Sequence, residues 1–540
     1  MNSPCLRYDE YELSRTSTHA SEDQESSLLS YDQDQDIYDA QFHLLPGQPL
    51  FDAKPAASSR LASLAPTWLR KQYHQRRSRA GAKRLARFFS CSPRSFLRKL
   101  ALFSYVFFTT ILIAVIVGGI FFPGYTHPPP HYGVLRERVL ASEAPGRANL
   151  QNQKIFIAAS IFDKDGRLFS GEWAENVLEL IQMLGPKNVF LSIYVNDSGP
   201  EASKALEALE RRVPCDHSLV FEDHLNFDDL PHVTLPDGTK RVKRIEYLAE
   251  VRNRALRPIE SSNTIFDKLL YLNDVVFHPI DATQLLFLTN TVVEGETNYR
   301  AACAVDFINP FKFYDTFATR DIEGYSMGLP FFPWFAANGD EQSHQDVLDG
   351  KDAVRVRSCW GGMVAFDAQF FQKRPGLSHE VETAGHQSPA NLTVPYRFRA
   401  EKDQYWDASE CCLIHADIQS PEPGNSGIYM NPFVRVAYDT RTLSWLGFTR
   451  RFERLYTPIH FLIDTVTSKP AYNPRRYEEP WQGVKEIVWI PDDKSENHGS
   501  FQRVARIATH TGFCGHRSLT VMKEDITEGE RNWEIVPTPS

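Results

Sequence analysis

The distribution of apolar and polar positions divides the chain into three regions of different character. Residues 1–52 are polar, and their aliphatic residues are too sparse for helical or strand spacing, which is typical of a disordered segment. An apolar run without any charge extends from Leu100 to Phe122. From Lys154 onwards, short apolar runs alternate with amphipathic stretches of helical period, which indicates a folded domain.

The apolar run from Leu100 to Phe122 predicts a single transmembrane helix. About 20 apolar residues span a bilayer core of about 30 Å. A buried helix of a soluble protein normally keeps a polar face, and this run has none. A signal peptide would lie within the first 30 residues or so, far from this position.

The folded region alternates between two kinds of element. The run KIFIAASIF has the nearly continuous apolar character of a strand buried on both faces. The predicted elements are strands at 154–162, 188–195, 217–221 and 266–277 and helices at 172–184, 200–212 and 241–256. This alternation predicts an α/β fold with a doubly wound, mainly parallel sheet. After Ala301 the pattern becomes irregular, and we expect loops, short strands and a few helices there.

Charge changes the picture by setting the orientation of the chain in the membrane. The formal net charge of −9 provides no electrostatic footprint for nucleic acid. Between Lys54 and Lys99, however, there are many basic residues and no Asp or Glu, whereas the flank after the apolar run lacks Lys and Arg and is rich in proline. The positive-inside tendency therefore places residues 1–99 in the cytosol and the large domain in the lumen, as in a type II protein.

These observations predict five regions. They are a cytosolic tail (1–99), a membrane anchor (100–122), a lumenal stalk (123–150), a catalytic domain (151–500) and a C-terminal extension (501–540). We expect the protein in the membranes of the secretory pathway, in the Golgi.

Glycosylation motifs and cysteines agree with a lumenal domain. Asn391 and Asn196 both begin an Asn-X-Ser/Thr acceptor motif. The lumenal cysteines are Cys215, Cys303, Cys359, Cys411, Cys412 and Cys514. An oxidising lumen permits disulfides, but six cysteines allow 15 complete pairings, and free buried thiols are the alternative for about half of them.

The strongest candidate for a metal site follows the fourth predicted strand. Asn273 and Asp274 end this strand, and in an open α/β sheet ligands bind at the carboxyl ends of the strands. A divalent cation that bridges a diphosphate needs carboxylate oxygens at this place. The usual device in nucleotide-sugar transferases is a DxD motif, which is lacking here, and an Asp at a strand end is also a common turn residue.

Two further clusters have the composition of a sugar pocket. The segment YDTFATRDIEG combines Asp315, Arg320 and Asp321 with aromatic residues, although a solvated turn would have the same composition. In VRVRSCWGGMVAFDA, Trp360 precedes Gly361-Gly362, and the two glycines allow a ligand to approach the backbone closely. A buried hairpin with its own turn glycines is the alternative for this second cluster.

The last candidates lie on two predicted helical segments. In ASECCLIHADI, Glu410 is placed to point into a cleft while His415 supplies an imidazole to the same metal, although a lone His is more often structural. A helix loaded with cations ends with Arg252 and Asn253 nearest the sheet, where they reach a bound nucleotide. Most of the other cations on that helix form a solvated face.

Taken together, these segments resemble the fungal capsule-associated α-1,3-mannosyltransferases of glycosyltransferase family 69. The motifs that carry the resemblance, in order within residues 150–440, are IAASIFDKDGRLFSGEW, IYVNDSGP, RIEYLAEVRNRALRP, LLYLNDVVF, CAVDF, YDTFATRDIEG, VRVRSCWGGMVAFDA and SECCLIHADI. The resemblance implies a GT-A-like fold, GDP-mannose as donor, a divalent cation that is usually manganese, and transfer to a mannoside acceptor.

The resemblance places the metal and the diphosphate near Asn273 and Asp274 and the Asp321 and Glu410 regions in the active cleft, and the other roles follow from the residues themselves. The expected sets are Asp274 and His415 for the metal, Asn273, Arg252, Asn253 and Arg320 for the donor, Trp360, Gly361, Gly362 and Asp315 for the sugar pocket, and Glu410 and Asp321 for catalysis. An α-linked product from an α-linked donor means net retention. Retention requires either a carboxylate nucleophile, for which Asp321 and Glu410 are candidates, or a front-face reaction assisted by the metal and basic groups.

Two other functions remain open at this point. A membrane-anchored glycoside hydrolase would use Asp321 and Glu410 as its carboxylate pair. A lectin-like or scaffolding homologue without catalytic activity would explain the missing DxD motif.

Overall fold

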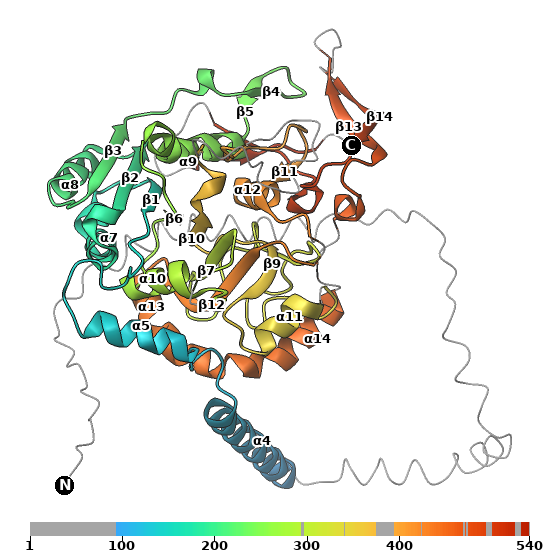
Figure 1. The fold of residues 1–540 in the computed structure, drawn as a ribbon. Coiled ribbons are helices and arrows are strands. Elements are labelled where there is room, and N and C mark those ends of the chain that lie inside the picture. Colours follow the sequence, from blue (N-terminus) through green and yellow to red (C-terminus); the bar gives the residue numbers. More distant parts are fainter. Residues whose placement is uncertain are drawn as a thin grey trace. The chain divides into compact units, whose positions relative to one another are not determined.

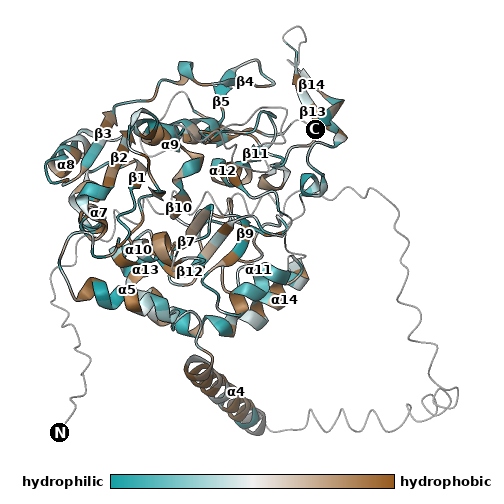
Figure 2. Cartoon of the chain, in the orientation of Figure 1, coloured by the Kyte–Doolittle hydropathy of each residue, from teal (hydrophilic) through white to brown (hydrophobic). Residues whose placement is uncertain are grey.

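The computed structural model describes residues 93–538 apart from 293–295, 340, 374–393, 423, 468–469, 471–472, 493–498 and 524–530. Helix α4 (Pro93–Phe121) belongs to a compact unit that ends at Pro123, and the folded domain begins at Gly124. The stretch of α4 from Leu97 to Phe121 has a hydropathy of 2.6 in its most apolar window, and no residue of that window is buried. It is apolar along its length (Figure 2), so its length and composition suit a membrane-crossing helix.

The domain is built on a nine-stranded sheet with the order β3-β2-β1-β6-β10-β7-β12-β9-β8. Its strands are β1 (Ile155–Ile161), β2 (Val189–Asn196), β3 (Asp216–Glu222), β6 (Lys268–Leu272), β7 (Ala301–Phe307), β8 (Arg320–Asp321), β9 (Val354–Ser358), β10 (Met363–Asp367) and β12 (Ile428–Ala437). Only β10 and β9 run against the other strands of this sheet. The predicted α/β fold class with a mainly parallel sheet is confirmed.

Helices cover both faces of the sheet, as Figure 1 shows. The longer ones are α5 (Pro130–Leu140), α7 (Glu172–Leu184), α8 (Pro200–Glu210), α9 (Arg244–Ser261), α10 (Pro279–Leu288), α11 (Glu341–Leu348), α12 (Glu410–Ile418), α13 (Thr440–Thr449) and α14 (Thr457–Thr467). Short helical turns occur at α6 (Arg167–Ser170), η1 (Pro186–Asn188), η2 (Phe227–Asp229), η3 (Ala368–Phe370), η5 (Arg450–Tyr456), η6 (Pro474–Tyr477) and η7 (Gly512–Cys514).

Strand β1 shows why the apolar runs predicted strands buried on both faces. Ile155, Ile157 and Ala159 pack into one core cluster with residues of α7 and α10. Phe156 and Ala158 point the other way, into a second cluster that contains residues of α9 and α12. Side chains alternate across a strand, so a strand covered on both faces needs apolar residues at every position.

The irregular pattern after Ala301 concealed four interior strands. β7, β9, β10 and β12 all come from that part of the chain and lie inside the sheet, where loops, short strands and a few helices were expected. β10 lies antiparallel between β6 and β7, and β12 contains a register shift between Met430 and Arg435. An antiparallel insertion and a bulge interrupt the simple strand–helix alternation on which the prediction relied.

The predicted stalk is packed on the domain almost from its first residue. Tyr125 and Tyr132 are 2% and 1% exposed, and Asn431 donates a 2.7 Å hydrogen bond to the Tyr132 hydroxyl. Helix α5 also buries Leu135 and Val139. Residues 124–140 therefore belong to the folded domain.

The C-terminal residues also belong to the domain. Their strands are β13 (Gly483–Pro491), β14 (Gly499–Ile507), β15 (Gly515–His516), β16 (Thr520–Met522) and β17 (Trp533–Ile535). β15 pairs with β11 (Asp407–Ala408), which lies in the earlier part of the domain. A separate hairpin is formed by β4 (His232–Thr234) and β5 (Lys240–Val242). The boundary expected at residue 500 falls inside the β13–β14 hairpin. A disulfide joins Cys412 of α12 to Cys514, and another joins Cys303 of β7 to Cys359.

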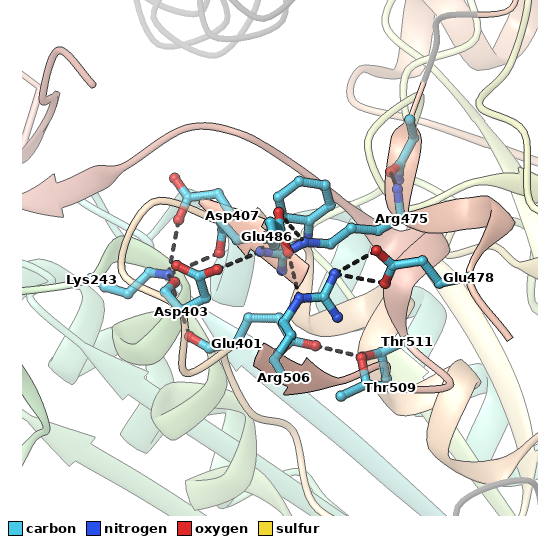
Figure 3. A network of polar contacts seen from close by, with 12 residues as sticks. Lys243, Glu401, Asp403, Asp407, Arg475, Glu478, Glu486, Arg506, Thr509 and Thr511 are labelled. Carbon is cyan, nitrogen blue, oxygen red and sulfur yellow. Dashed lines mark hydrogen bonds and ion pairs between the residues drawn. The ribbon is translucent and has the colours of Figure 1, made fainter. Parts of the chain in front are cut away.

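A charge network connects this C-terminal part to the rest of the domain (Figure 3). Its partly exposed section consists of Arg475 with Asp403 and Glu486, and of Arg506, which bridges Glu486 and Glu478. Lys243, which precedes α9, forms a buried pair with Asp407 at 3.3 Å. Breaking this buried pair on one side would leave an uncompensated charge, so it contributes most to holding the segment in place.

Candidate active site

The candidate site lies where the chain order of the sheet reverses. β1 and β6 are adjacent, with β2 and β3 on one side and the later strands on the other. Ligands of open α/β sheets bind beyond the carboxyl ends of the strands at this switch point. Asp163 follows β1 and Asp274 follows β6, so two carboxylates flank the reversal.

The Asn-Asp pair after β6 divides into a structural residue and an exposed one. The Asn273 backbone carbonyl accepts from the Trp173 indole, and its side-chain oxygen accepts from Trp360 Nε1 and Arg252 Nη1 at 3.2 and 3.3 Å. Asp274 is exposed and makes no hydrogen bond to another side chain within the described part of the chain. Asn273 is therefore held in place by three hydrogen bonds, and Asp274 is the carboxylate of the pair that faces solvent.

Although Asp274 is exposed, the surrounding protein atoms change the pKa of its carboxyl group. Desolvation raises the pKa of its carboxyl group above the usual range, and the charge of Asp163 adds to this effect, while Arg252 opposes it. A bound divalent cation would favour the carboxylate form in the same way as Arg252 does.

Arg252 of α9 is the centre of the site. Its guanidinium lies 4.4 Å from the Trp360 ring centroid and 5.4 Å from that of Tyr271. Its Nε donates a 2.9 Å hydrogen bond to Glu410 Oε1. Stacking between aromatic rings restricts the planar guanidinium to one orientation, and so fixes the position of the Glu410 carboxylate.

Glu410 occupies the first turn of α12. Ser409 caps this helix by accepting a hydrogen bond from the Cys411 N–H, and Glu410 itself is 3% exposed. A carboxylate at a helix N-terminus is stabilised by the unpaired N–H groups and the helix dipole. Together with Arg252, this environment holds a charged carboxylate against the switch point.

The turn before β10 contains Gly361 and Gly362, and the backbone there leaves no room for a larger residue. Gly361 has φ +57, and a Cβ there would lie 2.0 Å from the Ala304 carbonyl oxygen. Gly362 accepts a hydrogen bond from the Asn273 N–H at 2.9 Å. The two glycines thus let the turn pack closely against β7 and against the residues that follow β6, and Trp360 beside them stacks on Arg252.

A pair of buried carboxyl groups supports this turn from below. The Asp315 N–H donates to Asp306 Oδ1 at 3.1 Å, and the Asp315 carboxylate accepts from Ala318 N–H and Thr319 Oγ1. Burial, with the charge of Asp315 as the second cause, raises the pKa of Asp306 to about 8. Asp315 is therefore a supporting residue of the Gly361 turn, where a direct sugar contact was expected.

Asn253 and Arg320, which were predicted to bind the donor, instead form hydrogen bonds with the protein backbone. The Asn253 side chain exchanges two hydrogen bonds with the Phe398 backbone, which fixes the loop beside the site. Arg320 is buried and donates to the carbonyls of Phe513 and Cys514. Burial lowers its pKa to about 10. Neither the geometry nor the partners of Arg320 fit the expected donor contact.

Asp321 does not meet Glu410. Its carboxylate accepts from the N–H groups of Glu323 and Tyr325 in a turn, and its charge acts on Arg357, whose Nε donates to Gln419. Gln419 follows the last residue of α12, so Asp321 lies toward the end of this helix opposite to Glu410. A glycosidase would need the two carboxylates roughly 5–9.5 Å apart across one cleft, whereas Asp321 is held in a turn beside Arg357 and Glu410 lies beside Arg252.

His415 is a core residue. It is 0% exposed, its Nδ1 lies 2.6 Å from the Cys411 carbonyl oxygen, and its Nε2 lies 3.9 Å from Cys303 Sγ. Cys303, Cys359 and His415 bring their ligand atoms within 4.8 Å of one another, but the two cysteines form a disulfide. This placement does not fit a shared metal with Asp274.

The two glycosylation candidates have different outcomes. Asn391 lies outside the described residues. Asn196 is 4% exposed, and its amide nitrogen donates to Asp197 Oδ2 and to the Tyr247 hydroxyl at 2.7 and 2.6 Å. An acceptor nitrogen engaged in this way is not available for a glycan in the folded domain.

Asp163 and Asp306 are site residues that the sequence reasoning missed. Both end apolar strands, as Asp274 does, in the segments KIFIAASIFD and CAVDF. Asp163 accepts from the N–H groups of Leu168 and Phe169 and so forms the first turn after β1. A search for every acidic residue at the end of a predicted parallel strand would have identified them.

The sequence was compared with known protein families and with curated proteins. The family described as cryptococcal mannosyltransferase 1 matches residues 154–417, so this part of the chain is similar to that family. No curated protein matches the chain by sequence.

Two solved structures have some similarity to this chain. A mannosyltransferase from Pyrobaculum calidifontis in complex with GDP-Man and Mn2+ has 11% identity and a TM-score of 0.28, covering 68% of this chain and 78% of that one. Mannosyl-3-phosphoglycerate synthase from Rubrobacter xylanophilus has 11% identity and a TM-score of 0.25, covering 72% and 94%.

Proposed function

We propose that this protein transfers mannose from GDP-mannose to a mannoside acceptor, with retention and an α-1,3 linkage. The observation that carries the proposal is the exposed Asp274 at the switch point, beside the Arg252–Glu410 pair, within a domain similar to a mannosyltransferase family. The donor and the linkage are those that the family resemblance implies.

Asp274 is the residue that would hold a divalent cation. Hard cations such as Mn2+ and Mg2+ take oxygen ligands, and often bind through one or two carboxylates together with substrate phosphates. An exposed carboxylate at the end of β6 fits this requirement. When bound, the cation supplies charge stabilisation for the departing diphosphate.

Glu410 is the catalytic candidate that remains. Its carboxylate lies beside Arg252 at 2.9 Å and is fixed by the first turn of α12. In a covalent route its carboxylate attacks the anomeric carbon as the bond to the diphosphate oxygen breaks and GDP leaves; the acceptor hydroxyl then displaces the carboxylate and loses its proton to the departing diphosphate or to solvent. In a front-face route Glu410 stabilises the positive charge that develops at the anomeric carbon while the acceptor hydroxyl replaces GDP. Arg252 is a positioning residue in both routes, since it orients Glu410 and Asn273.

The membrane arrangement is part of the proposal. The apolar helix α4 would cross the membrane of the secretory pathway, with the folded domain in the lumen. The orientation rests on the basic residues before Lys99, most of which lie outside the described residues.

The proposal is tested with the purified full chain in detergent. Product formation from mannobiose should require GDP-mannose and Mn2+, and excess EDTA should abolish it. Asp274→Asn should lower the rate by at least about 100-fold, because loss of a metal-bridging carboxylate removes several kcal/mol of charge stabilisation.

The control for this variant is Asp229→Asn, since Asp229 is an exposed aspartate in the short turn η2. It should retain the parent rate, and both variants should keep the parent melting temperature. Full activity in excess chelator would remove the basis for a metal at Asp274. GDP-mannose binding without any product would favour the lectin-like alternative.

A further inference from the structure

Helix α14 has its polar residues inside and its apolar residues outside. His460 and Asp464 are 1% and 2% exposed and form an ion pair with 2.9 Å between Nδ1 and Oδ2. On the outer side, Ile459, Leu462 and Val466 are 52%, 63% and 75% exposed. These three residues follow the i, i+3, i+7 spacing of one helix face. A helix that faces water shows the opposite distribution.

The adjoining helix α13 continues the apolar surface. Trp445 and Phe448 are 49% and 57% exposed, and their ring centroids lie 5.9 Å apart. Arg441 and Arg451 are also exposed on this part of the chain. Figure 1 shows α13 and α14 on the same side of the domain as α5. Exposed aromatic and aliphatic residues with neighbouring arginines are typical of surfaces that lie in a membrane interface.

The covalent path from α4 leads directly to these helices. The Tyr125 N–H donates a 3.2 Å hydrogen bond to Glu453 Oε1 in η5, which connects α13 and α14. Gly124 abuts the Arg450 carbonyl so closely that a Cβ would lie 2.5 Å from it. α4 ends at Phe121, and four residues of extended chain span at most about 14 Å. The end of the apolar helix is therefore tethered within that distance of η5.

We propose that α13 and α14 lie on the lumenal surface of the bilayer that α4 crosses, with Trp445, Phe448, Leu462 and Val466 inserted among the lipids. This inference rests on the proposed anchoring of α4. The short tether selects the occupant, because it leaves little room for anything thicker than the lipid interface between the membrane and η5. Contact with the bilayer also removes from water the apolar side chains that α14 exposes.

Photochemical labelling of the full chain in lipid nanodiscs tests the inference. The nanodiscs contain a phospholipid with a diazirine in its acyl chain, and mass spectrometry locates the adducts after irradiation. Adducts are expected on α4 and on peptides that cover residues 445–466. Leu462→Ser/Val466→Ser should lower the labelling of the α14 peptide several-fold and leave that of α4 unchanged.

The matched control is Val220→Ser/Ile487→Ser, two exposed apolar residues of β3 and β13 on other parts of the domain. This variant should not change the labelling of α14, and the parent peptides around Val220 and Ile487 should carry no adducts. Adducts on α4 alone would overturn the inference and preserve the anchor. Absence of adducts on α4 would overturn both the anchor and this inference. Crosslinks between α14 helices of two chains, without lipid adducts, would assign the surface to a second copy.

Discussion

At the scale of single residues, the structure separates candidates that look alike in the sequence. Asn273 and Asp274 are neighbours, yet one is fixed by Trp360 and Arg252 and the other is exposed. Glu410 and Asp321 are both buried acids, but only Glu410 lies beside Arg252. The partners of a side chain therefore decide its role more than its type does.

The two acids should respond differently to neutralisation. Glu410→Gln keeps the side-chain size and one hydrogen-bonding oxygen for Arg252, so the fold should persist while the transfer rate falls by about 100-fold or more. Asp321→Asn should lower the melting temperature, because its carboxylate accepts two turn N–H groups, and should have a small effect on the rate of the folded fraction. Rates per folded molecule and thermal denaturation measure the two effects. A parent-like rate for Glu410→Gln would remove Glu410 from the catalytic set.

Buried histidines predict a loss of stability in acid. Burial lowers the pKa of His415 and of His516 to about 4, below the value of about 6.5 in an unfolded chain. The unfolded state therefore binds more protons between these values, and stability is lost as the pH falls from about 6.5 to about 4, by up to about 1.4 kcal/mol per pH unit for each histidine.

Denaturant titrations between pH 7 and pH 4.5 would measure this effect. His415→Gln should show a shallower decline of the unfolding free energy than the parent, although it is less stable at pH 7. His232→Gln serves as the control, since His232 is exposed. Equal slopes for the His415→Gln variant and the parent would contradict the assignment of His415 as a neutral core residue.

At the scale of elements, α12 connects the candidate site to the C-terminal part of the chain. Its N-terminus carries Glu410, and Cys412 in its first turn forms a disulfide with Cys514. The C-terminal segment is also held by Arg320, whose guanidinium donates to the carbonyls of Phe513 and Cys514. The position of Glu410 thus depends on residues about a hundred positions away in sequence.

Removal of this disulfide should weaken both the fold and the site. Its cysteines are separated by 102 residues, and a crosslink that closes a loop of this size contributes roughly 2–5 kcal/mol. Cys412→Ala/Cys514→Ala should lower the unfolding free energy by about that amount in urea titrations and reduce kcat. Cys215→Ala, which removes a half-buried free thiol, should change stability by less than about 1.5 kcal/mol. A double variant as stable as the parent would show that the charge network alone holds the C-terminal segment.

At the scale of the whole molecule, an apolar helix precedes a domain that begins at Gly124. The distance between them along the chain is short, and Tyr125 is already buried in the domain. Within the described residues, only Phe122 and Pro123 lie between the end of α4 and the start of the domain, so the chain has no long stalk there.

Protease treatment of intact microsomes tests the topology. If the domain is lumenal, the protease should remove only the cytosolic tail, and a fragment that contains α4 and the domain should survive. Detergent should make the domain accessible, and an epitope at each end of the chain identifies the fragments. Degradation of the domain in intact vesicles would reverse the orientation.

The sequence by itself determined the features that depend on local periodicity. The apolar run, the alternating strands and helices up to β6, and the position of Asp274 at a strand end all follow from the spacing of neighbouring residues. Helix α7 begins and ends at the predicted residues, because Gly185 and Pro186 terminate it locally.

Only the tertiary structure decided which distant residues meet. It placed β7, β9, β10 and β12 inside the sheet, paired four of the cysteines, and brought Arg252, Trp360 and Glu410 together. It also turned the apolar face of α14 outward, although a local pattern would direct that face to the core. The physical reason is that local spacing shows which residues share a face of an element, whereas the partner of that face is set by long-range packing and burial.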